Sequence, residues 1–250
     1  MVFFPSNRPL VIAHRGFAAS SPENTLPAFQ AALDLGADIL ETDVHLSRDG
    51  EVVVAHDPVL DRVAGRSGSI RDFTAAELQS IDLGGGVGMP TLAQVLEAFP
   101  HARFNIDLKT PEVVDPFIQT IRALDAVERV LVASFDESSR KRAVRELDGV
   151  ATSATRPHVF RGLAWSTLGA RRAFRRALDG IHAFQLPMSV AGVSLVGERF
   201  IRHATEAGMQ FQVWTINDVN TMDRLWRRGV TGFITDRTDL AMEWRQSLAS

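Results

Sequence analysis

Short apolar runs and amphipathic stretches alternate from one end of this 250-residue chain to the other. The apolar runs are typical of strands: Leu10–Ala13, Ile39–Leu46, Val52–Ala55, Phe104–Leu108, Val130–Ser134, Val150–Thr155, Ala183–Leu186, Gln210–Thr215 and Gly232–Thr235. Stretches with helical spacing follow most of them: Thr25–Leu35, Leu92–Phe99, Val113–Leu124, Ser138–Leu147, Arg171–Leu178, Arg199–Ala207, Val219–Arg228 and Leu240–Leu248. Val52–Ala55 pairs naturally with the run before it through the turn Arg48-Asp49-Gly50, which leaves eight strands.

Eight strands that alternate with helices over this length predict a (β/α)₈ TIM barrel. An open doubly wound sheet is the competing fold, but the first loop lacks the Gly-x-Gly-x-x-Gly pattern that such sheets carry. Helix ends agree with the alternation. We expect Asp218 and Asp239 to be N-caps, and Gly36, Gly208 and Gly229 lie where helices should end.

One stretch after the second strand departs from the alternation. Between Pro58 and Pro90 there are few strand signals and a single helix-like segment, Thr74–Ser80. We interpret residues 57–101 as an insertion that caps the barrel mouth, because the stretch is too short to bury a core of its own. The prediction is therefore one TIM-barrel domain over residues 1–250.

Composition excludes several classes of protein. The formal charge of −3 argues against nucleic acid as a main partner, and the absence of cysteine excludes disulfides, thiolate zinc sites and a cysteine nucleophile. The stretch Met1–Ser6 has no basic region of a secretion signal, and no run approaches the roughly 18 apolar residues of a membrane span. We expect a cytoplasmic protein without stable membrane insertion, and no particular oligomeric state is predicted.

Acidic residues gather at predicted strand ends. Glu41 and Asp43 are two residues apart on one strand, so their side chains point to the same side, which inside a barrel is the lumen. Two carboxylates pushed together take up protons unless a cation lies between them, and oxygen ligands select a hard ion such as Mg²⁺ or Ca²⁺. A solvated carboxylate pair is the alternative. Asp107, at another strand end, favours the metal site by supplying a third ligand.

Two histidines at strand ends are candidates for proton transfer. A histidine side chain titrates near neutrality, so one member of the pair His14 and His56 can act as base while the other acts as acid. A lone histidine after a strand is more often structural, but these two are flanked by Arg15 and Asp57. The other histidines lie in loops or helix-like stretches and are interpreted as surface or structural residues: His101, His158, His182 and His203.

Two cations accompany these groups. Arg15 offers a bidentate fork and Lys109 a point charge, and both suit the oxygens of a phosphate. In the alternative interpretation, Lys109 forms a plain ion pair with Asp107 or Glu112. His45 shares the face of the carboxylates and is expected to make a hydrogen bond just outside the site.

Two further features remain open from the sequence. Trp214, with Asn217 near a strand end, is either a wall of the pocket or a core tryptophan. The basic stretch Arg171–Arg176 carries Phe174, and a solvated barrel helix is preferred over contact with an anionic membrane.

The polar strand ends belong to motifs that resemble the glycerophosphodiester phosphodiesterase family. The matching segments are His14-Arg-Gly16, Pro22-Glu-Asn-Thr25, Gly36–Val44, Asp49–Asp57, Pro90-Thr-Leu92, Asn105–Lys109, Val213–Asn217 and Gly232–Asp236. They cover nearly the whole chain in order. The resemblance implies a TIM barrel with a small insertion after the second strand, which is where the sequence places residues 57–101.

The resemblance also implies roles for site residues. His14 and His56 would be the acid–base pair, Arg15 and Lys109 would face the phosphate, and the metal ligands would be Glu41, Asp43 and the acidic residue of Asn105–Lys109. Family members commonly carry glutamate where this chain has Asp107. Because aspartate is one methylene shorter, a bridging water or a deeper ion is implied here.

The expected function is metal-dependent hydrolysis of glycerophosphodiesters to sn-glycerol 3-phosphate and an alcohol. A phospholipase D-like activity on lysophospholipids is a rival that needs an apolar channel, for which the insertion offers Phe73 and Leu83. A metal-independent lyase is a rival from another class, using Asp107-Leu-Lys109 with Glu112. A non-catalytic binding module is disfavoured because both proton-transfer histidines are present.

Overall fold

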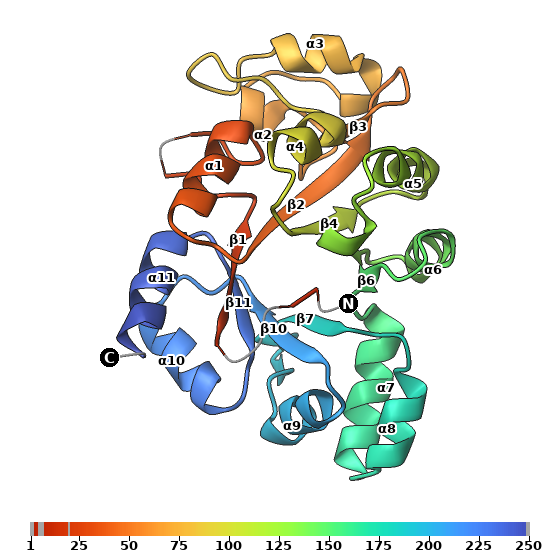
Figure 1. Ribbon diagram of the computed structural model, residues 1–250, viewed down its shortest axis with the longest axis vertical. Coiled ribbons are helices and arrows are strands. Elements are labelled where there is room, and N and C mark those ends of the chain that lie inside the picture. The colour runs from red at the N-terminus through yellow and green to blue at the C-terminus, as the bar shows by residue number, and fades with distance from the viewer. Residues whose placement is uncertain (1–2, 5–7, 20, 249–250) are drawn as a thin grey trace.

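Eight parallel strands form a ring in the computed structural model, which describes residues 3–4, 8–19 and 21–248 (Figure 1). Of the stretch Met1–Ser6, only Phe3 and Phe4 lie within the described residues. The strands of the ring are β1 (Leu10–His14), β2 (Ile39–Leu46), β4 (Phe104–Leu108), β5 (Val130–Ala133), β6 (Ala151–Thr152), β7 (Ala183–Pro187), β10 (Gln210–Trp214) and β11 (Gly232–Thr235).

The order of the strands closes the ring. Hydrogen-bonded neighbours run β6-β5-β4-β2-β1-β11-β10-β7, and a parallel bridge between Ser153 and Ala183 joins β6 to β7. Two further bonds support this seam, from the amide of His182 to the carbonyl of Thr152 (3.0 Å) and from Ala154 to Ala183 (2.8 Å). The predicted TIM barrel is confirmed.

Helices surround the ring: α1 (Leu26–Asp34), α4 (Leu92–Ala98), α5 (Val114–Ala123), α6 (Glu137–Glu146), α7 (Arg156–Thr167), α8 (Arg171–Ala177), α9 (Glu198–Glu206), α10 (Val219–Arg227) and α11 (Thr238–Ser247). Every predicted helix of the ring is present within two residues at each end. Asp218 caps α10 as predicted, accepting a bond from the amide of Thr221 (2.8 Å). The prediction for Asp239 is wrong, because α11 begins at Thr238 and Asp239 lies in its first turn, paired with Arg237.

One helix of the ring and a hairpin after β7 were not predicted. Helix α7 escaped notice because Phe160 and Leu168 lie on its exposed side, so that its apolar spacing marks no single buried face. A hairpin of two short strands, β8 (Ser189–Val190) and β9 (Val193–Ser194), follows β7 at the C-terminal end of the barrel.

The strand residues alternate between the inside and the outside of the ring. The inner residues form one cluster with the two N-terminal phenylalanines: Phe3, Phe4, Leu10, Ile12, Ile39, Leu131, Ala133, Ala151, Ala183 and Ile234. The outer residues pack under the helices in two larger clusters. Apolar side chains therefore fill the barrel interior toward the N-terminal ends of the strands, and the inward-facing polar residues lie at the C-terminal ends.

The insertion follows β3 (Val52–Val54), which pairs antiparallel with β2 as predicted. It continues through α2 (Asp61–Ala64), a 3₁₀ turn (Ile70–Asp72) and α3 (Ala75–Ser80), and extends outward beside α1 and α4 (Figure 1). Its apolar residues are buried together with those of β3. A small separate cluster forms on β3 residues and insertion residues: Val53, Ala55, Leu60, Ile70, Ala75, Leu78, Ile81 and Met89.

Candidate active site

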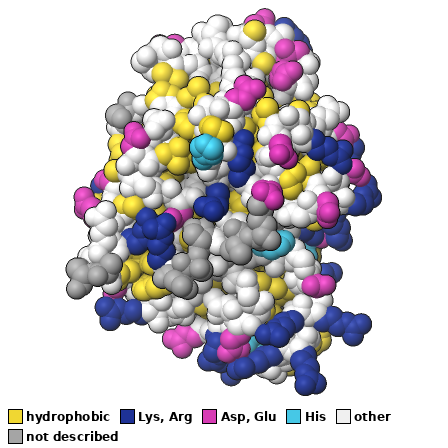
Figure 2. Space-filling model, viewed as in Figure 1, with side chains coloured by type: hydrophobic (Ala, Val, Ile, Leu, Met, Phe, Trp, Pro, Cys, Tyr) yellow, Lys and Arg dark blue, Asp and Glu magenta, His cyan; other side chains and the backbone are white. Residues whose placement is uncertain are grey.

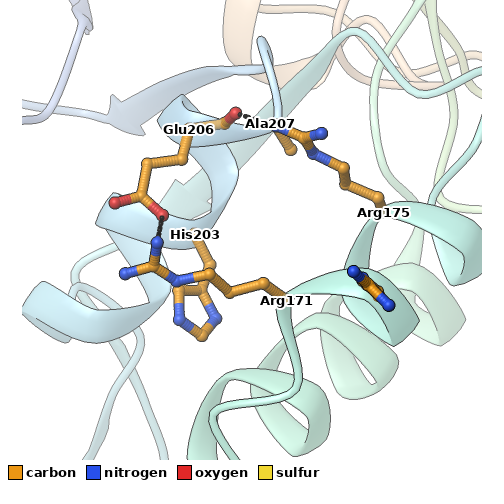
Figure 3. A pocket seen from close by; sticks show the side chains of 6 residues that line it. Arg171, Arg175, His203, Glu206 and Ala207 are labelled. Carbon is orange, nitrogen blue, oxygen red and sulfur yellow. Dashed lines mark hydrogen bonds and ion pairs between the residues drawn. The ribbon is translucent and has the colours of Figure 1, made fainter.

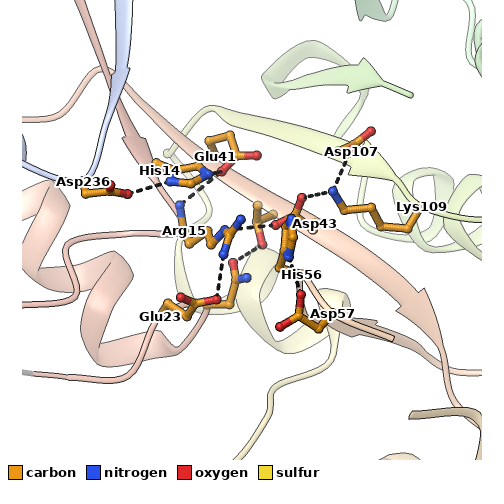
Figure 4. Close-up of polar contacts among 12 residues, drawn as sticks. His14, Arg15, Glu23, Glu41, Asp43, His56, Asp57, Asp107, Lys109 and Asp236 are labelled. Carbon is orange, nitrogen blue, oxygen red and sulfur yellow. Dashed lines mark hydrogen bonds and ion pairs between the residues drawn. The ribbon is translucent and has the colours of Figure 1, made fainter. Parts of the chain in front are cut away.

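The predicted site residues lie at the C-terminal ends of adjacent strands. In the register of the sheet His14 is level with Glu41, and Asp43 is level with Asp107. Because alternate residues face the same side, Glu41 and Asp43 continue the inward row that begins at Ile39. Figure 4 shows these side chains gathered at one place, with His14 and His56 on either side of Arg15 and Asp43.

His14 is held by a carboxylate that the sequence did not assign. Its Nδ1 lies 2.6 Å from Oδ1 of Asp236, and Asn217 donates its side-chain amide to Oδ2 of the same carboxylate (2.8 Å). These hydrogen bonds, with that from His14 the larger cause, lower the pKa of Asp236. Asp236 follows β11 two residues after the inward-facing Ile234, and this alternation was the signal that could have found it.

Arg15 occupies a tight turn after β1. Its φ of 59° is left-handed, and a Cβ on the next residue, Gly16, would lie 2.8 Å from the backbone of Ala28, so the turn requires glycine there. The turn directs the Arg15 amide to Oε2 of Glu41 (3.1 Å). The guanidinium donates to Glu23 (3.0 Å), and its Nε lies 3.6 Å from Asp43.

The insertion reaches the site through Arg62 of α2. Its guanidinium donates twice to Glu23 (2.7 and 2.9 Å) and once to Oδ2 of Asp57 (2.6 Å). The other oxygen of Asp57 lies 2.6 Å from Nδ1 of His56. The hydrogen bond to Glu23, followed by that to Asp57, raises the pKa of Arg62.

Arg62 therefore ties the carboxylate that orients His56 to the carboxylate that holds Arg15. The insertion borders the mouth through this contact and does not extend across it. Glu23 lies within the motif Pro22–Thr25, although no role was predicted for it, and nothing in the sequence pattern marked Arg62.

Three buried carboxylates lie close together, and two of them hold one ammonium group. Nζ of Lys109 lies 2.6 Å from Asp43 and 2.8 Å from Asp107. Burial, and then the charges of Asp43 and Asp107, raises the pKa of Glu41 well above its ordinary value, and burial also raises the pKa of Asp107. Burial alone would lower the pKa of Lys109, but the two aspartates outweigh it and raise the pKa.

The carboxylate cluster has the donor chemistry of a hard-cation site. Oδ2 of Asp43 and Oδ1 of Asp107 are buried without a hydrogen-bond partner, and Glu41 adds a third carboxylate. Within the described ranges, no group of three acidic, histidine or cysteine side chains is arranged closely enough to hold a metal ion. The positive charge of Lys109 instead neutralises the negative charge of the aspartates. The residues fit a divalent cation by charge and ligand type.

His45 was expected just outside this cluster, and its position is confirmed. Its Nε2 lies 3.0 Å from the backbone carbonyl of His56, and burial lowers the pKa of the ring. The contact links β2 to the backbone of a candidate catalytic residue.

Trp214 lies at the site, whereas Glu112 lies away from it. Trp214 ends β10 on the inward side and packs half-buried on the inner cluster, which is compatible with both predicted roles. Glu112 is exposed and its carboxylate bonds to Thr110, so it does not join Lys109. The carboxylate–lysine arrangement expected of a lyase is therefore not assembled.

The fold and the site together define a class of enzyme. A TIM barrel carries, at the C-terminal ends of its strands, two imidazoles that are each oriented by a carboxylate, a fixed guanidinium and a buried carboxylate cluster. Such a set moves protons beside an anionic substrate, which is the chemistry of a phosphodiester hydrolase.

Comparison with known proteins names the family. The sequence model of the Glycerophosphoryl diester phosphodiesterase family matches residues 14–240. A probable glycerophosphodiester phosphodiesterase 2 of Mycobacterium tuberculosis is 37% identical, over 92% of this chain and 88% of that protein. A glycerophosphodiester phosphodiesterase of Caldanaerobacter subterraneus is 32% identical, over 91% and 93%. The chain belongs to the glycerophosphoryl diester phosphodiesterase family and is an enzyme that hydrolyses glycerophosphodiesters.

Further comparisons concern the fold and a more distant relative. The crystal structure of a putative glycerophosphoryl diester phosphodiesterase from Silicibacter pomeroyi superposes with a TM-score of 0.81 at 22% identity, covering 99% of this chain and 96% of that one. A lysophospholipase D of Rattus norvegicus is 26% identical, over 96% of this chain and 87% of that protein. No helix in the described residues is both long and apolar enough to cross a bilayer.

Proposed function

We propose that the enzyme releases sn-glycerol 3-phosphate and an alcohol from glycerophosphodiesters, using a divalent cation and the pair His14 and His56 as acid and base. One observation carries the proposal. Each ring binds a carboxylate through Nδ1, His14 with Asp236 and His56 with Asp57. Nε2 of His14 lies 4.0 Å from Glu41, beyond hydrogen-bond distance, so we assign the Nε2 atoms to the substrate. A carboxylate on Nδ1 fixes the tautomer, so that Nε2 accepts or returns a proton.

The cations hold the phosphate in place during this transfer. Arg15 is fixed by Glu23 and faces the site, where its guanidinium neutralises the phosphate that otherwise repels an oxygen nucleophile. One histidine deprotonates a water or the neighbouring glycerol hydroxyl, which would give a cyclic phosphate first. The other protonates the leaving alkoxide.

The carboxylates Glu41, Asp43 and Asp107 would hold the cation, Mg²⁺ or Ca²⁺. When bound, it adds positive charge beside the phosphate. Lys109 at present neutralises Asp43 and Asp107, so a cation on these oxygens would loosen their hold on its ammonium group and leave it for the phosphate.

A substrate panel tests the proposal. Glycerophosphodiesters are incubated with Ca²⁺, with Mg²⁺ and with chelator, and glycerol phosphate and alcohol are measured. We expect release only with a cation, together with a cation-dependent rise in Tm that Asp43→Asn abolishes. Full turnover after exhaustive chelation contradicts the cation, whereas failure of every glycerophosphodiester contradicts the substrate.

A phospholipase D-like activity on lysophospholipids is the second candidate. Phe73 and Leu83, considered for this role from the sequence, are half-buried against the insertion's own cluster. The hairpin after β7 instead exposes Met188, Val190 and Val193 at the C-terminal end of the barrel, which supplies apolar surface there. Faster release of choline from lysophosphatidylcholine than from glycerophosphocholine would favour this candidate. The cytoplasmic location stays a prediction, which cell fractionation tests.

A further inference from the structure

Charge is segregated along this chain in a way that the catalytic site does not explain. Between Val150 and Leu178 there are six arginines and no aspartate or glutamate. The rest of the chain therefore holds the other 21 basic residues against all 30 acidic ones. The basic segment forms β6 and the helix pair α7 and α8, which pack side by side on the outside of the barrel (Figure 1).

An exposed apolar stripe runs along the same element. Arg156, Phe160, Ala164 and Leu168 follow one another at intervals of four residues, so they share one side of α7, and all four are exposed. Phe160 and Leu168 keep 71% and 72% of their surface exposed. No residue of the barrel covers this side of the helix within the described part of the chain.

The stripe continues to the catalytic end of the barrel. Phe135, in the loop after β5, is 59% exposed, and the guanidinium of Arg156 lies 5.8 Å from the centre of its ring. Since α7 starts at the end of β6, this contact places the upper end of the stripe at the rim of the mouth. The surface formed by Phe135, the α7 stripe and the arginines of α7 and α8 is called the α7–α8 face below.

The arginines of the α7–α8 face fall into two groups. Arg171 and Arg175 reach across a cavity of about 390 Å³ to α9, where they bind the carboxylate of Glu206 (3.1 Å) and its backbone carbonyl (2.8 Å), as Figure 3 shows. They fasten α8 to the barrel. The others are exposed, and none makes an ion pair with an acidic side chain of the described residues: Arg156, Arg161, Arg176, and Arg172, which also lines the cavity.

We infer that the α7–α8 face docks on an anionic lipid surface. Exposed Phe160 and Leu168 beside unpaired arginines give the two contributions of an interfacial helix, apolar burial at the acyl boundary and attraction to anionic headgroups. Figure 2 shows basic side chains gathered at this end of the molecule. The segment that forms α7 and α8 carries six arginines and no carboxylate, whereas the rest of the chain has an excess of acidic residues. Nucleic acid would be attracted to the arginines, but it offers no apolar surface on which Leu168 could be buried.

Vesicle co-sedimentation of the full chain tests whether the arginines contribute to lipid binding. We expect binding to vesicles of phosphatidylcholine with phosphatidylglycerol, no binding to phosphatidylcholine alone, and loss of binding as salt is raised. The double variant Arg172→Gln, Arg176→Gln should partition about 25-fold more weakly, at about fivefold for each cation removed. The matched control is Arg224→Gln on α10 with Arg228→Gln directly after it, which removes two exposed arginines at the same spacing and should bind as the unaltered chain does.

A second pair of variants tests the apolar contribution. Phe160→Ser and Leu168→Ser remove apolar surface without opening the core, and should weaken vesicle binding while turnover of soluble glycerophosphocholine stays unchanged. The inference is overturned if the chain ignores anionic vesicles, if phosphatidylcholine alone binds it equally, or if the α10 control loses as much binding as the α8 variant. It is also overturned if a short DNA oligonucleotide binds the chain and vesicles do not.

Discussion

The two halves of the barrel mouth share one backbone design and differ in what the strands carry at their ends. Strands β4, β2, β1 and β11 are neighbours in the ring, and the charged residues of the site lie at their ends: Asp107, Lys109, Glu41, Asp43, His14 and Asp236. The other four strands end in neutral residues: Ala133, Thr152, Pro187 and Trp214. The chemistry is therefore confined to one contiguous half of the ring.

The difference shows how charge is used in each half. In the charged half, burial and like charges raise the pKa of Glu41, so the cluster opposes its own ionisation and depends on Lys109 and Arg15. Perturbed groups of this kind are typical of functional sites. In the neutral half, Glu137 binds Arg140 and Thr155 and so joins α6 to the start of α7 at the surface. The first arrangement serves reactivity and the second stability.

The largest expected effect separates the two halves by activity. His14→Ala and His56→Ala should each lower kcat/KM for glycerophosphocholine by about 10²–10⁴ while the far-ultraviolet circular dichroism stays unchanged. His101→Ala, which removes an exposed histidine away from the strand ends, should retain full turnover. Near-normal turnover in both site variants would remove the histidine pair from the mechanism.

Lys109 distinguishes the halves by stability. Lys109→Met leaves Asp43 and Asp107 buried without their ammonium partner, which should cost about 3 kcal/mol in the free energy of unfolding. Added Ca²⁺ or Mg²⁺ should restore more Tm in this variant than in the unaltered chain. Lys141→Met, at an exposed lysine, is the control. Equal denaturation midpoints for Lys109→Met and Lys141→Met would show that the cluster does not need its cation.

Arg62 tests whether the insertion serves the charged half. Arg62→Gln should lower kcat/KM about tenfold, because Asp57 and Glu23 lose the group that orients them. Burial would raise the pKa of Asp57, but hydrogen bonds from His56 and Arg62 outweigh it, so losing Arg62 moves this pKa upward. The pH profile of kcat/KM should therefore change on its acidic limb, where Asp57 takes up a proton.

Two variants control for a merely structural effect of Arg62. Arg62→Lys keeps the charge without the bidentate fork and should fall between the unaltered chain and the glutamine variant. Arg66→Gln removes a neighbouring arginine whose guanidinium lies 5.1 Å from the centre of the Phe73 ring, and should leave the profile unchanged. A pH profile that does not move in Arg62→Gln, whatever the rate, would limit Arg62 to packing.

The sequence predicted the charged half better than the neutral one, for a physical reason. Alternation along a strand fixes which side Glu41 and Asp43 face, so their positions on the strand are enough to predict that the two side chains lie close together. Arg62 could not be predicted, because its partners depend on how an insertion folds back over many residues. Helix α7 was missed because its exposed phenylalanine and leucine obscure the period from which helices are predicted. The residues that escaped were those whose position depends on tertiary contacts or on an outside partner.

The smallest expected effect concerns Glu137 in the neutral half. It accepts two hydrogen bonds from Arg140 (3.0 Å each) and one from Thr155 (2.7 Å), which joins α6 to the start of α7. Burial would raise the pKa of Glu137, but these bonds outweigh it and lower the pKa to about 2. Because its pKa is lowered, ionised Glu137 stabilises the folded chain at pH values above its ordinary pKa of 4.5, and this contribution is lost as the pH falls from there toward about 2.

Glu137→Gln should therefore lower the free energy of unfolding by about 1 kcal/mol at pH 7, since the pair is partly solvated, and by nothing near pH 2. Urea denaturation across this range measures the difference, with Glu128→Gln, an exposed carboxylate outside any ion pair of the described residues, as control. A constant difference between the Glu137 variant and the unaltered chain at every pH would mean that shape, and not charge, holds α6 against α7.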